Sequence, residues 1–517
     1  LNKSINKLQN YLYNSRYKRA LELFRKIESK FPNNFNMKYI KVGTLIDSGA
    51  NLNRKDLVEE GIKSGLDIIE DLRKKENIAT IYYNIANAYN NLYHFNFDEN
   101  NKFEYLINND YLQKSKKYFR KSLEYKNDIK DERLKQILCN YGNCLDSLGR
   151  GIESINIYNS ALDIDSDFSM AIANKAKAIR YFADITGKYR VATYVTVYQT
   201  ITDLLENEDI IKYGGKEAQE SFQREVQDIK NIIQDDELLQ NKFEHNPYKF
   251  SNHSELEKFY VKFSLRNNLF LNLHIHDDFC EAAVGDPIFI KIVTQTYEPS
   301  IYYELAKYIN QIKEDYATAR YLLVQSQFQK NDLSRISKLT TYVNTLDYST
   351  FDLYTGLLKC AFKQAFNILD KIAVFINEYL DIQYQGNIYF WTKNIWLDNN
   401  QNGEVTPKRE IIESENISLY ALFDIYLDFR EYYFEHIQNL RNAAMHEKLV
   451  IYDSCLSDYD NDNDKYNISY DLFYERTIEL FNLVRASIIY LINFVNNEEN
   501  KKSNDDGKKI SMNVPTT

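Results

Sequence analysis

Near the C-terminal end of the chain, residues 441–446 read Arg-Asn-Ala-Ala-Met-His and combine a guanidinium with an imidazole. An imidazole titrates near neutral pH, so it can take the proton from a ribose 2′-hydroxyl or return one to the leaving oxygen. A guanidinium offers two parallel N–H donors, which stabilise the charged phosphorane that forms between these steps. The pair Arg441 and His446 could therefore cleave RNA without a metal ion.

A purely structural role is open for each residue of this segment. Arg441 could cap the preceding helix or pair with Glu431 or Glu435. His446 could be an ordinary surface imidazole, and Asn442 could either orient the site or only end the helix. The spacing of Arg and His is by itself a weak signal, so the surrounding elements must decide between these roles.

Three predicted helices surround the segment. Apolar residues recur at the 3-and-4 spacing of a buried stripe in residues 351–382, and further helical stretches cover 418–440 and 471–497. The second stretch delivers residues 441–446 at its end. Long helices joined by polar loops predict an antiparallel helical bundle.

Two charged residues lie in the latter half of the first predicted bundle helix, Asp370 and Lys371. Either one could assist the Arg–His pair, or the two could form an ion pair inside the bundle. The sequence leaves both interpretations open.

The N-terminal third repeats a pattern of about 34 residues that is typical of stacked helix pairs. Each pass carries a small or apolar residue where the first helix of a pair packs closely, followed by aromatic and small positions in the second helix. The middle repeats carry insertions, which we expect in loops. The close-packing positions are Leu8, Gly43, Ala86, Gly142 and Ala176.

The bulk composition limits the classes of protein that remain. With 517 residues, 44% of them apolar, and only 6 prolines, the chain has material for two or three domains of long helices. A formal charge of -10 argues against nonspecific coating of nucleic acid, so any RNA contact must be a local basic site. Five cysteines without a C-x-x-C pair predict neither a disulfide framework nor a zinc site. The longest apolar stretch, 486–495, is too short to span a bilayer, so we expect a cytoplasmic protein without membrane contact.

The sequence thus predicts a mainly all-α chain with a small irregular or mixed segment in the middle. We expect a helical repeat domain at 1–182, a helical and mixed connecting region at 183–343, a helical bundle at 344–499 and a disordered tail at 500–517.

Two family resemblances match this division. Residues 1–180 resemble the tetratricopeptide (TPR) repeats, which implies a curved solenoid whose concave face binds a protein or peptide partner. A plain scaffold that only holds the next domain is the alternative. Residues 256–499 resemble the HEPN superfamily (higher eukaryotes and prokaryotes nucleotide-binding), in the branch whose motif reads Arg-Asn followed by His. Further landmarks of the HEPN resemblance are the stretches 268–272, 316–323, 344–348 and 366–379.

The HEPN resemblance implies roles for particular residues. Arg441 and His446 would be the catalytic dyad, Asn442 would orient the site, and Asp370 or Lys371 would assist. In this family the dyads of two units face each other across a dimer, so one motif per chain implies a homodimer. No metal and no other cofactor is implied. Residues 443–445 are small and apolar where relatives often carry a Glu before the His, which leaves any role of that Glu open.

The leading hypothesis is a metal-independent endoribonuclease that leaves 2′,3′-cyclic phosphate and 5′-hydroxyl ends on its RNA substrate. Relatives often act as toxins or in antiphage defence, which implies that a signal sensed by the repeats releases the activity. One alternative is a noncatalytic protein that binds RNA or nucleotide and recruits a partner. Another is the toxin of a two-component pair, silenced when a cognate antitoxin modifies a nearby residue such as a tyrosine.

Overall fold

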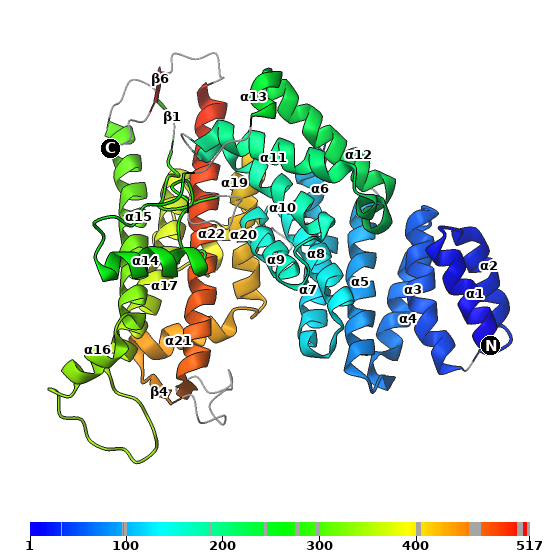
Figure 1. Cartoon of the computed structure of the whole chain (residues 1–517), viewed down its shortest axis with the longest axis horizontal. Coiled ribbons are helices and arrows are strands. Elements are labelled where there is room, and N and C mark those ends of the chain that lie inside the picture. The colour runs from blue at the N-terminus through cyan, green and yellow to red at the C-terminus, as the bar shows by residue number, and fades with distance from the viewer. Residues whose placement is uncertain are drawn as a thin grey trace. The chain divides into compact units, whose positions relative to one another are not determined.

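The protein is seen in a computed structural model. It describes residues 1–32, 34–95, 97, 101–186, 189–241, 246–273, 280–290, 292–295, 300–399, 405–453, 467–503 and 510–513. The chain divides into two compact units (Figure 1): residues 1–178 with 204–220, and residues 179–203 with 221–517. Both units are built from helices, and the strands are short. The predicted mainly all-α fold is confirmed.

The first unit is a row of helix pairs in which the main helices from α1 to α9 each pack on the next along the chain (Figure 1). This stacking of hairpins buries a continuous core between neighbouring pairs, which is the physical basis of a solenoid. The predicted repeat architecture is therefore confirmed. Its main helices are α1 (Asn2–Tyr13), α2 (Tyr17–Glu28), α3 (Phe35–Asn51), α4 (Lys55–Ile68), α5 (Lys75–Phe95), α7 (Tyr111–Leu123), α8 (Asp131–Ser147), α9 (Gly151–Ile164) and α10 (Ser169–Tyr181).

The close-packing positions of the repeats lie where helices meet. Leu8 and Ala86 are fully buried, and Ala176 is 1% exposed. A Cβ atom on Gly142 would come within 2.4 Å of the Tyr158 ring, so the α8–α9 pair needs a glycine there. The insertion between α5 and α7 was expected to be a loop, but it contains the seven-residue helix α6 (Lys102–Asn108).

The second unit contains an antiparallel bundle centred on α17 (Leu353–Tyr379). This helix begins at a capping box in which the Asp352 side chain accepts from the backbone of the first turn, and its apolar stripe is fully covered. It packs against α15, α21 and α22. The other bundle helices are α15 (Ser300–Gln327), α20 (Ile417–Arg430), α21 (Glu435–His446) and α22 (Tyr470–Ser503).

The bundle differs from the sequence prediction at two points. The stretch 418–440 is not one helix, because the chain turns between α20 and α21 at Tyr432, whose φ is +62°. Helix α15 lies in the predicted connecting region, yet it packs along the length of α17. Its buried residues Ile309, Ile312 and Tyr316 follow the 3-and-4 spacing that this contact requires.

Helix α22 is the core helix of the bundle. Among the described residues it alone is long and apolar enough to cross a membrane, with a mean hydropathy of 1.6 in its most apolar stretch. In the structure 83% of that stretch is buried by the rest of the protein. The helix continues to Ser503, into the predicted tail. The tail residues 504–509 and 514–517 lie outside the described residues.

The remaining elements connect these helices. They are α11 (Arg190–Leu205), α12 (Glu208–Ile233), α13 (Asp236–Gln240), α14 (Glu255–Arg266), α16 (Lys330–Ser337), α18 (Lys393–Trp396) and α19 (Arg409–Ser414). Three two-stranded sheets complete the second unit. Strands β1 (Ile292–Gln295) and β6 (Ile510–Asn513) pair antiparallel, as do β2 (Leu397–Asn399) and β3 (Val405–Pro407), whereas β4 (Val450–Tyr452) and β5 (Asn467–Ser469) pair in parallel.

Candidate active site

Helix α21 brings the predicted pair into contact. Arg441 Nη1 lies 3.4 Å from His446 Nε2 and donates to the Asn442 Oδ1 atom at 3.2 Å. His446 is the last residue of the helix and is exposed, whereas Arg441 is 6% exposed. When Nε2 accepts from the guanidinium, the imidazole is neutral and carries its proton on Nδ1. The contact is long, so it orients the imidazole without holding it tightly.

Three aromatic rings surround the guanidinium. The Arg441 Cζ atom lies 5.6 Å from the centre of the Phe366 ring, 5.4 Å from Tyr389 and 5.2 Å from Trp391. Phe366 comes from α17, and the other two come from the segment between α17 and α18. Such contacts fix a cation by attraction to the ring faces and use none of its N–H donors. The buried Arg441 Nε atom has no hydrogen-bond partner among the described residues.

Asp370 of α17 contacts both Arg441 of α21 and the backbone of the aromatic segment at Phe390. Its Oδ2 atom lies 3.6 Å from Arg441 Nη2, and its Oδ1 atom accepts from the Phe390 backbone N–H at 2.9 Å. Burial raises the pKa of Asp370 to about 6, against the lowering effects of the Phe390 N–H and the Arg441 charge. Arg441 therefore pairs with Asp370 and not with Glu431 or Glu435, the partners that a purely structural role suggested.

Lys371 lies on another side of α17. Its ammonium forms an ion pair with Asp315 of α15, and Gln364 donates to the other oxygen of that carboxylate at 3.1 Å. Consecutive helical residues point about 100° apart, so Asp370 and Lys371 cannot both face α21. The structure thus brings Arg441, Asn442, His446 and Asp370 together and leaves Lys371 in a contact between bundle helices.

Sequence reasoning missed the aromatic residues of the site. Tyr389 and Trp391 lie in an irregular segment, where no periodicity marks a residue as buried or functional. The available signal was the tryptophan itself, because the chain has only 2 and both, Trp391 and Trp396, follow the first bundle helix closely. Trp396 is fully buried and donates to the Phe390 carbonyl at 2.7 Å, so it anchors the backbone of the segment that carries Tyr389 and Trp391.

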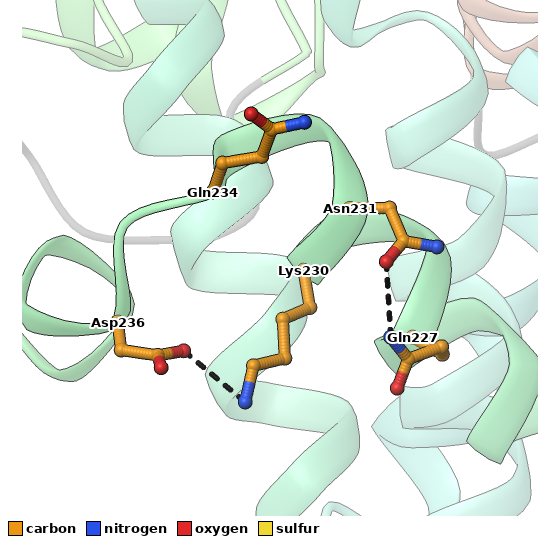
Figure 2. A pocket seen from close by; sticks show the side chains of 5 residues that line it. All are labelled: Gln227, Lys230, Asn231, Gln234 and Asp236. Carbon is orange, nitrogen blue, oxygen red and sulfur yellow. Dashed lines mark hydrogen bonds and ion pairs between the residues drawn. The ribbon is translucent and has the colours of Figure 1, made fainter.

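Another hollow of the second unit is a weaker candidate. A shallow depression of about 420 Å³ is lined by Gln227, Lys230, Asn231, Gln234 and Asp236. The Lys230 ammonium lies 3.1 Å from the Asp236 carboxylate, and Gln227 donates to Asn231 at 3.0 Å. Figure 2 shows both contacts as dashed lines. Four of the five lining side chains thus pair with one another, and the group includes no imidazole. Within the described parts of the chain, no group of three or more His, Cys, Asp or Glu is placed to hold a metal ion.

The first unit has a hollow of its own, of about 540 Å³, lined mainly by α1, α3, α5 and α8, with further residues from α2, α10 and α12. Asp47 of α3 and Arg133 of α8 line it, and Arg133 lies 5.3 Å from the centre of the Tyr83 ring. The Asp47 side chain is exposed to solvent and lies in the field of the Arg133 charge. The hollow therefore presents both charges beside tyrosine rings.

Comparison with known proteins finds a family match within the second unit. Residues 296–498, which hold the bundle and the Arg–His pair, match a HEPN domain. The matching family model is described as LA2681-like HEPN. The HEPN resemblance seen in the sequence is thus confirmed for residues 296–498, a range that includes α15. No curated protein matches this chain.

Similar solved structures are TPR proteins, and they match the N-terminal part of the chain. One is the crystal structure of TTC0263, a thermophilic TPR protein of Thermus thermophilus, at 15% identity and a TM-score of 0.30. The matched region covers 41% of the present chain and 96% of the TTC0263 chain. The other is the TPR2AB domain of yeast Sti1 in a complex with pHSP90, at 16% identity and a TM-score of 0.18, covering 44% of this chain and 97% of that chain.

Proposed function

We propose that the protein is an endoribonuclease that cleaves RNA without a metal ion, with Arg441 and His446 as its catalytic pair. The observation that carries the proposal is their contact at the end of α21, where an exposed imidazole lies 3.4 Å from a guanidinium fixed by aromatic rings. The match of residues 296–498 to a HEPN domain supports an RNA-related role for this unit.

The reaction follows from the two functional groups. The 2′-oxygen of a ribose attacks the adjacent phosphorus as an imidazole takes the 2′-hydroxyl proton, and the guanidinium binds the phosphorane oxygens. The bond from phosphorus to the 5′-oxygen then breaks, and that oxygen takes up a proton. The products are a 2′,3′-cyclic phosphate and a 5′-hydroxyl. His446 supplies the acid or base, Arg441 the positive charge, and Asn442 holds the Arg441 side chain in place.

A single substitution tests the proposal. His446→Ala should reduce RNA cleavage in EDTA by about a hundredfold or more, because it removes the proton-transfer group from an exposed position where the fold does not depend on it. The matched control is His253→Ala, which removes a histidine that bonds to Tyr248 elsewhere in the second unit and should leave cleavage unchanged. Equal cleavage by the wild type and the His446 variant would refute the assignment.

We also propose that two chains form the working enzyme and that the first unit binds a protein or peptide partner that controls it. The chain carries one Arg-Asn-x3-His motif, so a site with separate acid and base needs a second copy. The hollow of about 540 Å³ in the first unit, with Asp47, Arg133 and tyrosine rings, has the mixed polarity of a peptide-binding surface. A role as a toxin or antiphage effector would require such control, because a free ribonuclease harms its own cell.

A second candidate function is binding of RNA without cleavage. The observation that favours it is the burial of the Arg441 side chain, which is only 8% exposed, because a guanidinium so covered is less accessible to the phosphorane that cleavage requires it to bind. The two functions separate cleanly in one assay. A wild-type protein that retains RNA on a filter but leaves it intact over hours at neutral pH is a binding protein and not a nuclease.

A further inference from the structure

Two aromatic rings beside Arg441 stack on each other and are not yet used by the proposed chemistry. Tyr389 and Trp391 are nearly parallel, with an interplanar angle of 5° and ring centres 5.2 Å apart. Tyr389 is 37% exposed, and Trp391 is half-buried. No hydrogen bond joins the Tyr389 hydroxyl or the Trp391 indole to a described residue, although buried rings of these types usually find a partner.

The backbone between the two rings is held on both sides. The Phe390 ring is fully buried, its N–H donates to Asp370 at 2.9 Å, and its carbonyl accepts from Trp396 at 2.7 Å. The Tyr389 N–H donates to the Thr392 hydroxyl at 2.8 Å, which closes the turn. Tyr389 and Trp391 flank this anchor, so their rings are fixed before any ligand arrives, and binding costs little ordering.

Shielding of the guanidinium does not explain both rings. Phe366 already covers one side of Arg441 and is itself completely buried, as a shielding ring should be. Tyr389 contacts the same cation at 5.4 Å but leaves more than a third of its surface open. An exposed, fixed ring whose partner ring is parallel to it is suited to stack a further flat group, and nucleobases stack on such rings in single-stranded complexes.

We propose that Tyr389 and Trp391 form a stacking platform for the base of a single-stranded RNA nucleotide whose phosphate lies at Arg441. The distances suit this pose, because the base of a nucleotide lies within one ribose of its phosphate and both rings lie next to the guanidinium. The platform selects unpaired RNA, since a base in a duplex has no free face. This inference rests on the proposed RNA function of the same site.

Tryptophan fluorescence tests the platform directly. The chain has two tryptophans, and Trp396 is fully buried, so quenching by a ligand reports on Trp391. A short single-stranded oligoribonucleotide should quench the fluorescence of the full-length His446→Ala protein, which binds without turnover. Tyr389→Ala in this background should weaken binding roughly tenfold or more, the loss seen when one stacked base loses its ring. A double-stranded RNA of equal length should not quench.

The controls separate stacking from folding. Tyr389→Phe keeps the ring and should bind like the parent, whereas Tyr321→Ala removes a tyrosine that is 46% exposed on α15 and should change nothing. In cleavage assays with His446 present, Tyr389→Ala should raise KM and leave kcat nearly unchanged, as expected for a group that binds ground state and transition state alike.

The outcomes distinguish this inference from the proposed function. Cleavage and binding that Tyr389→Ala leaves unchanged would overturn the platform while the nuclease stands. Binding and quenching by a protein that never cleaves RNA would support the platform and overturn the nuclease. A wild type that neither binds nor cleaves single-stranded RNA would overturn both.

Discussion

At the scale of single residues, the decisive feature is how Arg441 is fixed. Its guanidinium is held mainly by ring faces, its contacts with His446 and Asp370 are 3.4 and 3.6 Å long, and its Nε atom is unpaired among the described residues. Short hydrogen bonds would fix a guanidinium equally well but would occupy the donors that a phosphate needs. Ring contacts fix it and leave those donors available.

Asp370 is expected to make the stability of the protein depend on pH. Its pKa is raised to about 6, so the folded state favours the protonated carboxyl more than the unfolded chain does. This contribution to folding is fully present below about pH 4 and is lost as the pH rises through about 6. Asp370→Asn keeps an acceptor for the Phe390 N–H and carries no charge. It should therefore raise the free energy of unfolding by on the order of 2 kcal/mol at pH 7.

Chemical denaturation of the two proteins at several pH values checks this expectation. The difference in free energy of unfolding should shrink steadily between pH 6 and pH 4. A destabilised Asp370→Asn protein at pH 7 would show instead that the charge of Asp370 is needed to balance Arg441.

The Arg–His pair could be predicted from the sequence, and its aromatic surroundings could not. Arg441 and His446 stand out because only a few residue types do acid–base and phosphate chemistry. Asp370 was named only together with Lys371, as the charged residue of the first bundle helix that the HEPN resemblance implies, and the structure separates the two. Tyr389 and Trp391 belong to a segment without regular structure, where a position is set by tertiary contacts such as the anchoring of Phe390. In such a segment no regular spacing of apolar residues indicates which side chains will pack together.

At the scale of elements, the helix pairs of the first unit pack so closely that one added Cβ atom can disturb them. Gly142 and Gly43 occupy equivalent repeat positions, but a Cβ atom would lie 2.4 Å from Tyr158 at Gly142 and 3.6 Å from Asn84 at Gly43. Gly142→Ala should therefore destabilise the first unit by about 1–3 kcal/mol, because it overpacks the α8–α9 pair. Gly43→Ala should be neutral or slightly stabilising, because alanine favours the helix and meets no clash.

Thermal unfolding followed by circular dichroism compares these two variants with the parent. The control lies in the same unit and has the same chemical change, so only local packing differs. Equal melting temperatures for the two variants would show that the Tyr158 ring moves aside without loss of stability, and would contradict the overpacking argument.

Helix positions were predicted well where periodicity is strong and poorly where a turn interrupts it. The stretch 351–382 corresponds to α17 at Leu353–Tyr379, and 471–497 corresponds to α22 at Tyr470–Ser503. The break between α20 and α21 was missed, because Tyr432 adopts a positive φ there and the sequence has no glycine at this position to indicate a turn. This break makes α21 a separate short helix, which begins at Glu435 and ends at His446.

At the scale of the whole molecule, dimerisation is expected to govern activity. If two chains form one cleft, the cleavage rate per chain should be constant at high concentration and fall on dilution below the dissociation constant of the dimer. Sedimentation over the same concentrations should show the dimer giving way to the monomer. A rate per chain that stays constant while the protein becomes monomeric would contradict a shared site.

Control by a partner is expected to act through the first unit. Arg133→Ala removes a cation from the hollow and should abolish co-purification of a partner protein from the native cell. Arg19→Ala, on the exposed side of α2, removes a similar charge outside the hollow and should not affect it. Equal recovery of the partner with both variants would place its binding surface elsewhere.

The most direct test of the central claim is the chemistry of the RNA ends that the protein produces. RNA from cells that express the wild type or His446→Ala would be sequenced by ligation specific for 5′-hydroxyl ends. We predict new 5′-hydroxyl ends, matched by 2′,3′-cyclic phosphates, in the wild-type cells only. The same ends in both samples, or 5′-phosphate ends in the wild type, would contradict cleavage by Arg441 and His446.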